Sequence, residues 1–153
     1  MMLIGIGATE EMPKALLDNI QITADNMQYD PSNKSATAKG NVKLVYIINS
    51  LPVTLTSTIL HAQFDDSGNL TNVTAEDNVE ITYETSHLYA QTCTHDFDKQ
   101  STVCTGPDVI LTKNNDKMHG NKATLDTSTQ VFTMHTTGKN QVTGIIHPAP
   151  PTK

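Results

Sequence analysis

The sequence predicts an all-β fold of stacked antiparallel hairpins, and three observations support this. A hairpin-like unit repeats about every 30 to 35 residues, apolar and polar residues alternate within it, and the chain is rich in Thr and lacks Trp. Because a β-branched side chain such as Thr fits a strand better than a helix, the composition favours strands on its own. The 153 residues suffice for one domain with a hydrophobic core.

Four copies of the unit emerge when the chain is aligned with itself. The first arms of the copies are residues 27–30, 62–65, 93–96 and 123–126. The second arms align as well, although the third carries an extra residue and the fourth loses its similarity to the others towards its end. Three copies keep the same separation between their two anchor residues, namely Met27 to Ala38, Cys93 to Cys104 and Ala123 to Met134.

Each copy reads as a strand, a turn and a second strand. Residues 42–46 and 79–83 show the period-two alternation of a half-buried strand. The turns are rich in Asp, Asn, Ser, Pro and Gly, which favour chain reversal. We interpret their Asp residues as turn formers rather than as acids or ligands, because each turn contains one.

A single hairpin cannot bury its apolar side, so the four copies should share one interior. Alternation also places Tyr46, Tyr83, Cys93 and Ala123 on this inner face. The predicted inner-face residues, which would contact a lipid, are Ile22, Ala24, Met27, Tyr29, Ala36, Ala38, Val42, Leu44, Ile59, Ala62, Phe64, Val73, Ala75, Val79, Ile81, Leu88, Ala90, Val109, Leu111, Met118, Leu125, Phe132 and Met134.

The segments IQITADNMQYD, AKGNVKL and AEDNVEI, together with the stretch from LYAQTCTHDFD to STQVFTM, resemble the OstA-like (LptA-type) family over residues 20–138. The Gly-Asn-Val element is kept at Gly40, but Asp77 replaces the second glycine. Asp77 must therefore adopt whatever backbone geometry the glycine supplies, which Asp does better than most residues. Pro107 cannot donate to a strand ladder, so we expect a bulge or an edge there.

This resemblance implies a β-jellyroll over residues 20–146 that is open at both ends. It implies a periplasmic, non-catalytic protein without a cofactor, which shields the lipid A acyl chains of lipopolysaccharide (LPS) between its sheets. It further implies a bridge from the inner-membrane Lpt complex to the outer-membrane LPS translocon, with head-to-tail copies joined by their edge strands.

The inner face is rich in Ala and Met, which leave space and adapt to varied apolar shapes. The alternative is an ordinary sandwich core filled by its own side chains. The net charge of −6 argues against a nucleic-acid partner. It also suggests that the protein grips the acyl chains while the phosphorylated head group stays in water.

Cys93 and Cys104 occupy facing positions of one hairpin, so a disulfide between them is expected in an oxidising periplasm. Two buried thiols are the alternative. The six His residues show no metal-ligand spacing, and we expect no metal site. The sequence also contains no nucleophile motif, phosphate loop or dinucleotide fingerprint.

Residues 1–19 are either the end of a secretion signal or an apolar terminus, with a short helix expected from Thr9 to Asn19. Residues 147–153 form a Pro-rich tail that should be extended or disordered. No stretch approaches the roughly 20 apolar residues that span a bilayer.

Three other functions fit the sequence less well. The chain could be a polymerising structural β-protein with a dry core, or the periplasmic domain of the inner-membrane Lpt partner, which should carry an N-terminal transmembrane helix. A β-solenoid enzyme acting on polysaccharide would need clustered acidic residues on an exposed sheet face, and the alternation predicts none.

Overall fold

The computed structural model describes residues 20–48, 50–126, 128–129, 131–137 and 141–146. The terminal segments expected at 1–19 and 147–153 lie outside the described residues. The described chain forms one antiparallel ten-stranded sheet and contains no helix, which confirms the all-β prediction. Its strands are β1 (Gln21–Thr23), β2 (Asn26–Asp30), β3 (Ser35–Ile48), β4 (Leu51–Phe64), β5 (Leu70–Tyr83), β6 (Ser86–Asp96), β7 (Ser101–Lys113), β8 (Asp116–Asp126), β9 (Val131–His135) and β10 (Thr143–Ile145).

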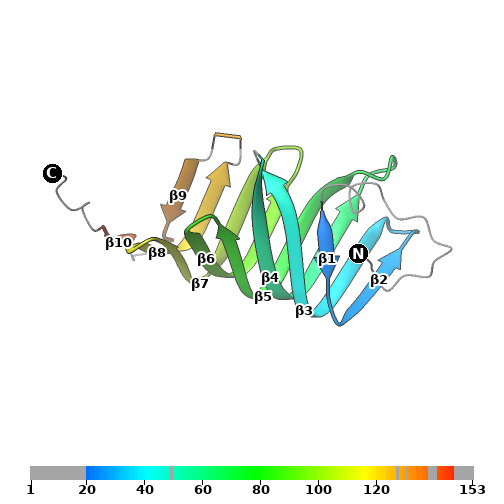
Figure 1. The fold of residues 1–153 in the computed structure, drawn as a ribbon, viewed down its shortest axis with the longest axis horizontal. Helices are drawn as coiled ribbons and strands as arrows, with labels where there is room; N and C mark the ends of the chain where they lie inside the picture. The colour runs from blue at the N-terminus through cyan, green and yellow to red at the C-terminus, as the bar shows by residue number, and fades with distance from the viewer. Residues whose placement is uncertain (1–19, 49, 127, 130, 138–140, 147–153) are drawn as a thin grey trace.

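Strands β3 to β8 pair in sequence order, so the hairpins follow one another along the long axis of the molecule (Figure 1). The four predicted repeats are the hairpins β2–β3, β4–β5, β6–β7 and β8–β9. In register, residues of the repeats form rows across the sheet, and in the second repeat Leu60 takes the place that the sequence alignment gave to Ala62, because the β4–β5 register shifts between Gln63 and Phe64. One row runs through Met27, Ala38, Leu60, Ala75, Cys93, Cys104, Ala123 and Met134.

Each repeat reverses at an Asp whose carboxylate accepts backbone N–H groups of its own turn. The Asp65 carboxylate accepts from Ser67 and Asn69, both at 2.9 Å, and Asp30, Asp96 and Asp126 do the same in their turns. These hydrogen bonds lower the pKa of the Asp30, Asp65 and Asp126 carboxyls. The largest effect comes from the Asn33 backbone N–H at Asp30, from the Asn69 backbone N–H at Asp65 and from the Ser128 hydroxyl at Asp126. The turn-forming interpretation is confirmed, and in the third turn the accepting carboxylate is that of Asp96, which receives the N–H groups of Asp98 and Lys99.

A bend crosses the middle of every long strand, where the register shifts in each pairing from β3–β4 to β7–β8. In β3 and β5 the bend consists of two residues with positive φ, Gly40–Asn41 (82° and 49°) and Asp77–Asn78 (68° and 55°). Asp77 thus adopts the left-handed conformation expected at a glycine position. In β7 the bend is a bulge between Thr105 and Val109 that contains Pro107, as predicted.

The bend divides the sheet into two halves, which we call leaf 1 and leaf 2. Leaf 1 comprises residues 42–48, 51–57, 79–83, 86–90, 109–113 and 116–120 with β1 and β10, and leaf 2 comprises residues 35–39, 59–64, 70–76, 92–96, 101–105 and 122–126 with β2 and β9. Both edges of the sheet are therefore split. β1 and β2 pair with opposite halves of β3, and β10 and β9 pair with opposite halves of β8.

The two leaves face each other across the interior. Tyr46 of leaf 1 has its ring centroid 5.7 Å from that of His95 in leaf 2, although their strands are not neighbours in the sheet. The same ring lies 6.1 Å from Phe97, which follows β6. The sheet therefore folds over itself as an open V, with its core between the leaves.

One predicted inner-face residue is wrong. Ile59 pairs with Lys39 and Glu76 on the outer face, and its neighbour Leu60 is buried instead, with 1 % exposed. The cause is the bend in β4, where the step from the inward-facing Ser57 to the next inward-facing residue, Leu60, is three positions rather than an even number. Because alternation has a period of two, an odd step reverses every later position.

Candidate ligand-binding cavity

A cavity of about 260 Å³ lies between the two leaves towards the C-terminal end of the sheet. Leaf 1 supplies side chains from β3 to β7, and leaf 2 supplies side chains from β7, β8 and β9. Its lining is Tyr46, Val53, Ile81, Tyr83, Glu84, Ser86, Leu88, Thr102, Leu111, Lys113, Leu125 and Phe132. The lining is mainly apolar, with the polar groups confined to a few positions, as is typical of small-molecule sites.

Most predicted inner-face residues point inwards, but few line this cavity. Ile81, Leu88, Leu111, Leu125 and Phe132 do. The fully buried remainder are core residues: Ile22, Ala38, Val42, Leu44, Ala62, Phe64, Val73, Ala75, Val79 and Val109. The partly buried remainder packed against that core are Ala24, Met27, Tyr29, Ala36, Ala90 and Met134, and Met118 is half-buried in register with Leu111.

The cavity also has lining residues that the alternation argument did not select. Val53 belongs to the segment LPVTLTS, whose alternation of Val53, Leu55 and Ser57 was a readable signal. Thr102 and Lys113 are polar, and nothing in their local sequence marks them as lining a cavity. Their positions follow from the strand register, which places Thr102 beside Leu125 and Lys113 beside Ser86.

Tyr46 and the rings next to it form one wall of the cavity. Tyr46 is 5 % exposed, and burial raises its pKa to about 12. Behind it, His95 contacts Phe97 edge-on at 4.4 Å between centroids, and its Nδ1 lies 2.7 Å from the Thr102 Oγ1. Burial lowers the pKa of His95 to about 4, against a smaller opposing effect of the Asp96 charge, so the ring is neutral at pH 7.

The opposite side of the cavity meets solvent at the turn between β5 and β6. Glu84 and Lys113 are exposed there, and Ser86 is half-buried. These groups of opposite charge provide no net field that would draw in an anion. The cavity is therefore suited to an apolar chain whose polar end stays near water.

Cys93 and Cys104 form a disulfide between β6 and β7, with the sulfurs 2.04 Å and the Cα atoms 4.0 Å apart. Both residues are at most 1 % exposed and lie in the inner row of leaf 2. The bridge joins neighbouring strands of one leaf, as the repeat alignment predicts, and does not cross the interior.

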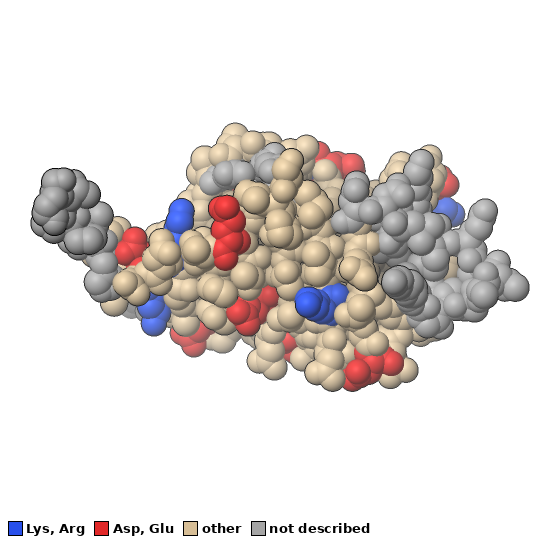
Figure 2. All heavy atoms as spheres, viewed as in Figure 1, with Lys and Arg blue, Asp and Glu red and all other residues tan. Residues whose placement is uncertain are grey.

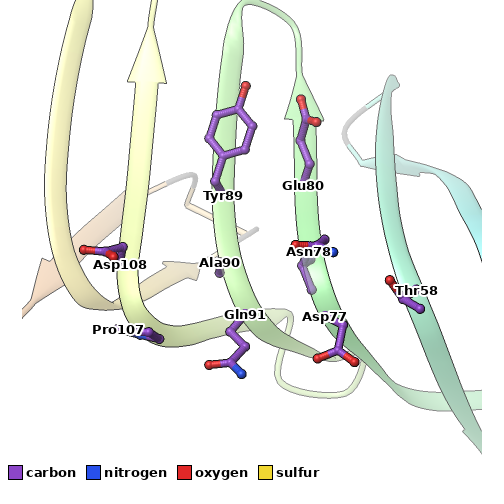
Figure 3. Close-up of a pocket in the computed structure, with 10 residues that line it drawn as sticks. Thr58, Asp77, Asn78, Glu80, Tyr89, Ala90, Gln91, Pro107 and Asp108 are labelled. Carbon is purple, nitrogen blue, oxygen red and sulfur yellow. The ribbon is translucent and has the colours of Figure 1, made fainter.

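A second hollow, of about 730 Å³, lies on the outer side of the bend (Figure 3). Side chains from β4 to β7 line it, including Asp77, Glu80 and Asp108. Glu80 is 3.3 Å from the His87 ring nitrogen, and Asp108 is 2.9 Å from that of His119. Among the described residues, no three His, Cys, Asp or Glu side chains are grouped so that they could hold a metal ion.

On the face shown in Figure 2, acidic and basic side chains are scattered among uncharged ones and form no broad basic patch. Within the described part of the chain, no helix has the length and apolar character needed to cross a membrane.

Comparisons with known proteins point in one direction. The family described as LptA/(LptD N-terminal domain) LPS transport protein matches residues 21–131. The solved structure of LptH from Pseudomonas aeruginosa, described as the LptA-homologous periplasmic component of the conserved lipopolysaccharide transport device, shares the fold with a TM-score of 0.73. It is 17 % identical, and the match covers 89 % of this chain and 100 % of that one. Comparison with curated proteins gives no match.

Proposed function

Since the chain belongs to the LptA and LptD N-terminal-domain family of LPS transport proteins, we propose that it carries LPS through the periplasm with the acyl chains between its two leaves. The observation that carries the proposal is the mainly apolar cavity between leaves that face each other without closing into a barrel. The family is one of transport proteins, not enzymes, and a site that shields a chain from water needs no catalytic group.

The energetics favour acyl chains as the cargo. Burying one methylene is worth about 0.8 kcal/mol, so roughly eight methylenes would contribute about 6 kcal/mol without any charged contact. The cavity of about 260 Å³ lies just below the range of roughly 300 to 1,000 Å³ that is typical of ligand pockets. We therefore propose that it shelters a segment of one chain at a time, and that the five predicted residues lining it are the first lipid contacts.

We propose that the head group remains in water. The protein carries a net charge of −6, which repels a phosphorylated head group at long range. Lys113 at the mouth is accompanied by Glu84, so its attraction is offset locally. Dephosphorylated LPS should accordingly bind as well as intact LPS, and abolished binding would contradict this part of the proposal.

The split edges support head-to-tail contact with further copies and with the inner-membrane and outer-membrane components of the transport system. Among the described residues, β1 and β2 pair only with β3, and β9 and β10 pair only with β8. Near the C-terminal edge, Val131, Ile145 and Ile146 are 57 %, 57 % and 75 % exposed. An added strand would satisfy the free backbone groups and cover these apolar side chains.

Site-specific photocrosslinking tests the cargo. A photoreactive amino acid at Phe132 or Leu125 should crosslink to LPS, whereas the same group at Thr124, the outward neighbour of Leu125, should not. Equal crosslinking inside and outside would contradict the proposal. Absence of crosslinks at every inner position would contradict it as well.

A polymerising structural β-protein is the second candidate, because much of the interior is densely filled. Val42, Leu44, Leu60 and Val109 are at most 1 % exposed. Mass spectrometry of lipid that co-purifies with the protein separates the two candidates, since a structural polymer would carry none. Recovery with the membrane fraction rather than the soluble periplasmic fraction would favour the inner-membrane partner's domain.

A further inference from the structure

The hydroxyl of Tyr46 is a polar group in the buried part of the cavity wall, and an unbranched hydrocarbon chain would leave it without a partner. Tyr46 lines the cavity and is 5 % exposed, and within the described part of the chain its hydroxyl makes no hydrogen bond. The hydroxyl is not completely buried either, because no completely buried polar atom lacks a partner among the described residues. It therefore keeps some accessible surface, on a residue that lines the cavity.

The neighbouring polar groups make no hydrogen bond with the Tyr46 hydroxyl. The nearest buried ring is His95, whose Nδ1 is engaged by the Thr102 hydroxyl at 2.7 Å. Thr102, which is 3 % exposed, also lines the cavity. A hydroxyl has one donor and two acceptor positions, so the Thr102 oxygen keeps capacity for a second partner. Tyr46 and Thr102 thus place two hydroxyl groups on an otherwise apolar wall.

A polar group in an apolar site carries a desolvation cost unless its ligand provides a partner. We propose that this wall is a hydrogen-bonding subsite for a hydroxylated acyl chain, with the Tyr46 hydroxyl pairing with a hydroxyl on the chain. The inference rests on the proposed function and specifies the chemistry of its cargo.

A hydroxyl group on the chain fits this wall better than a carbonyl. A carbonyl only accepts, so it would leave the acceptor positions of Tyr46 and Thr102 unused, whereas a hydroxyl both donates and accepts. The distance of Tyr46 from the exposed end of the cavity also argues against a carbonyl. Four strand pairings separate Tyr46 from Lys113 at that end, which is a distance of at most about 19 Å at roughly 4.8 Å per strand. The ester or carboxyl end of a chain would lie at that mouth, in contact with water.

The test compares acyl chains that differ only by one hydroxyl. Dodecanoate, 3-hydroxydodecanoate and 12-hydroxydodecanoate would be titrated into the full-length protein by calorimetry below their micellar concentrations. The wild-type protein should bind at least one hydroxylated chain about 2- to 10-fold more tightly than dodecanoate, the effect of one net hydrogen bond. Tyr46→Phe keeps the ring packing and should abolish this preference while it binds dodecanoate at least as tightly.

Tyr89→Phe is the matched control, because Tyr89 loses the same atom but lies on the outer face with 40 % exposed. It should leave all three affinities unchanged. Equal affinities of the three chains for the wild-type protein would overturn the inference, as would an equal loss for all chains in Tyr46→Phe. Those results leave the proposed function intact, whereas failure of every chain to bind, together with absent LPS crosslinks, would overturn the proposed function itself.

Discussion

The interior has a filled region and an open region, although one repeated hairpin builds both. Between β3 and β6 the leaves are joined by the rings of Tyr46, His95 and Phe97, and residues such as Leu44 are almost completely buried. Towards β7, β8 and β9 the facing residues Leu111, Leu125 and Phe132 are only partly buried and line the cavity. Residues of one type, Leu44 and Leu125, are thus almost completely buried in one region and only partly buried in the other, so residue type alone does not determine where a ligand can enter.

Matched truncations should show the largest difference between the two regions. Leu44→Ala removes a side chain that is 1 % exposed and should lower the free energy of unfolding by about 3 to 5 kcal/mol, because a cavity remains. Leu125→Ala only widens an existing cavity and should cost about 1 to 2 kcal/mol. Urea unfolding measures both, and equal losses would remove the distinction between the regions.

Acidification should weaken the filled region. The pKa of His95 is about 4 in the folded protein and about 6.5 when unfolded, so the unfolded chain binds the proton first as the pH falls. The stability is complete above about pH 6.5 and should fall by about 3 kcal/mol by pH 4, since each pKa unit corresponds to about 1.4 kcal/mol. The measurement is the unfolding free energy at several pH values.

The control for this prediction removes the titrating ring. His95→Phe combined with Thr102→Val keeps an aromatic side chain at position 95. The single substitution His95→Phe would leave the Thr102 hydroxyl unpaired, and the second substitution removes that hydroxyl. The double variant should lose stability less steeply than the wild-type protein between pH 6.5 and pH 4. Parallel pH profiles would show that His95 does not cause the acid sensitivity.

Removing the disulfide tests the boundary between the regions, where β6 meets β7. Cys93→Ala combined with Cys104→Ala should lower the unfolding free energy by about 2 to 3 kcal/mol, since the bridge closes a short loop. Acyl-chain affinity should not change, because neither residue lines the cavity. Thiol titration of the unfolded, unreduced wild-type protein should find no free thiol, and two free thiols would contradict the bridge.

Changes at the bends should have the smallest effects and leave binding unaltered. Gly40→Ala should cost about 1 to 2 kcal/mol, because Gly40 has φ +82° and an added Cβ would lie 2.6 Å from the Asp25 carboxylate. Asp77→Gly relieves a left-handed conformation at φ 68° and should stabilise the protein by at most about 1 kcal/mol. Altered acyl-chain affinity in either variant would show that the backbone, as well as the side chains, shapes the cavity.

Local patterns were sufficient for much of the fold. The repeat predicted the hairpins, the Asp-initiated turns, the bulge at Pro107 and the pairing of Cys93 with Cys104. These features depend on residues close in sequence or on one constant spacing. The same alternation failed at Ile59, because an odd step at the bend of β4 changes which residues face inwards. Reading LPVTLTSTILHAQF from both ends would have exposed the conflict, since Val53 and Leu60 cannot share one uninterrupted alternation.

The cavity itself could not be predicted from local sequence patterns. Its size depends on how far the leaves separate, and that depends on contacts such as Tyr46 with His95, which are distant in the sequence and belong to non-adjacent strands. Lys113 and Thr102 line the cavity only because the strand register places them beside other lining residues. The small residues of the inner face indicated available space but not where the space would be, because the rings of the central strands fill part of it.

The position of the disulfide decides which strands of the molecule are joined covalently and which are not. The covalent cross-link ties two adjacent strands within one wall, so oxidation stiffens that wall without clamping it to the opposite one. Between the walls the ring contacts of Tyr46 provide about 0.5 to 1.5 kcal/mol each beyond simple burial. Packing of buried residues such as Leu44 and Leu60 holds the walls together as well, so within the described chain the two walls are joined by non-covalent contacts alone, whereas the strands of one wall are joined covalently.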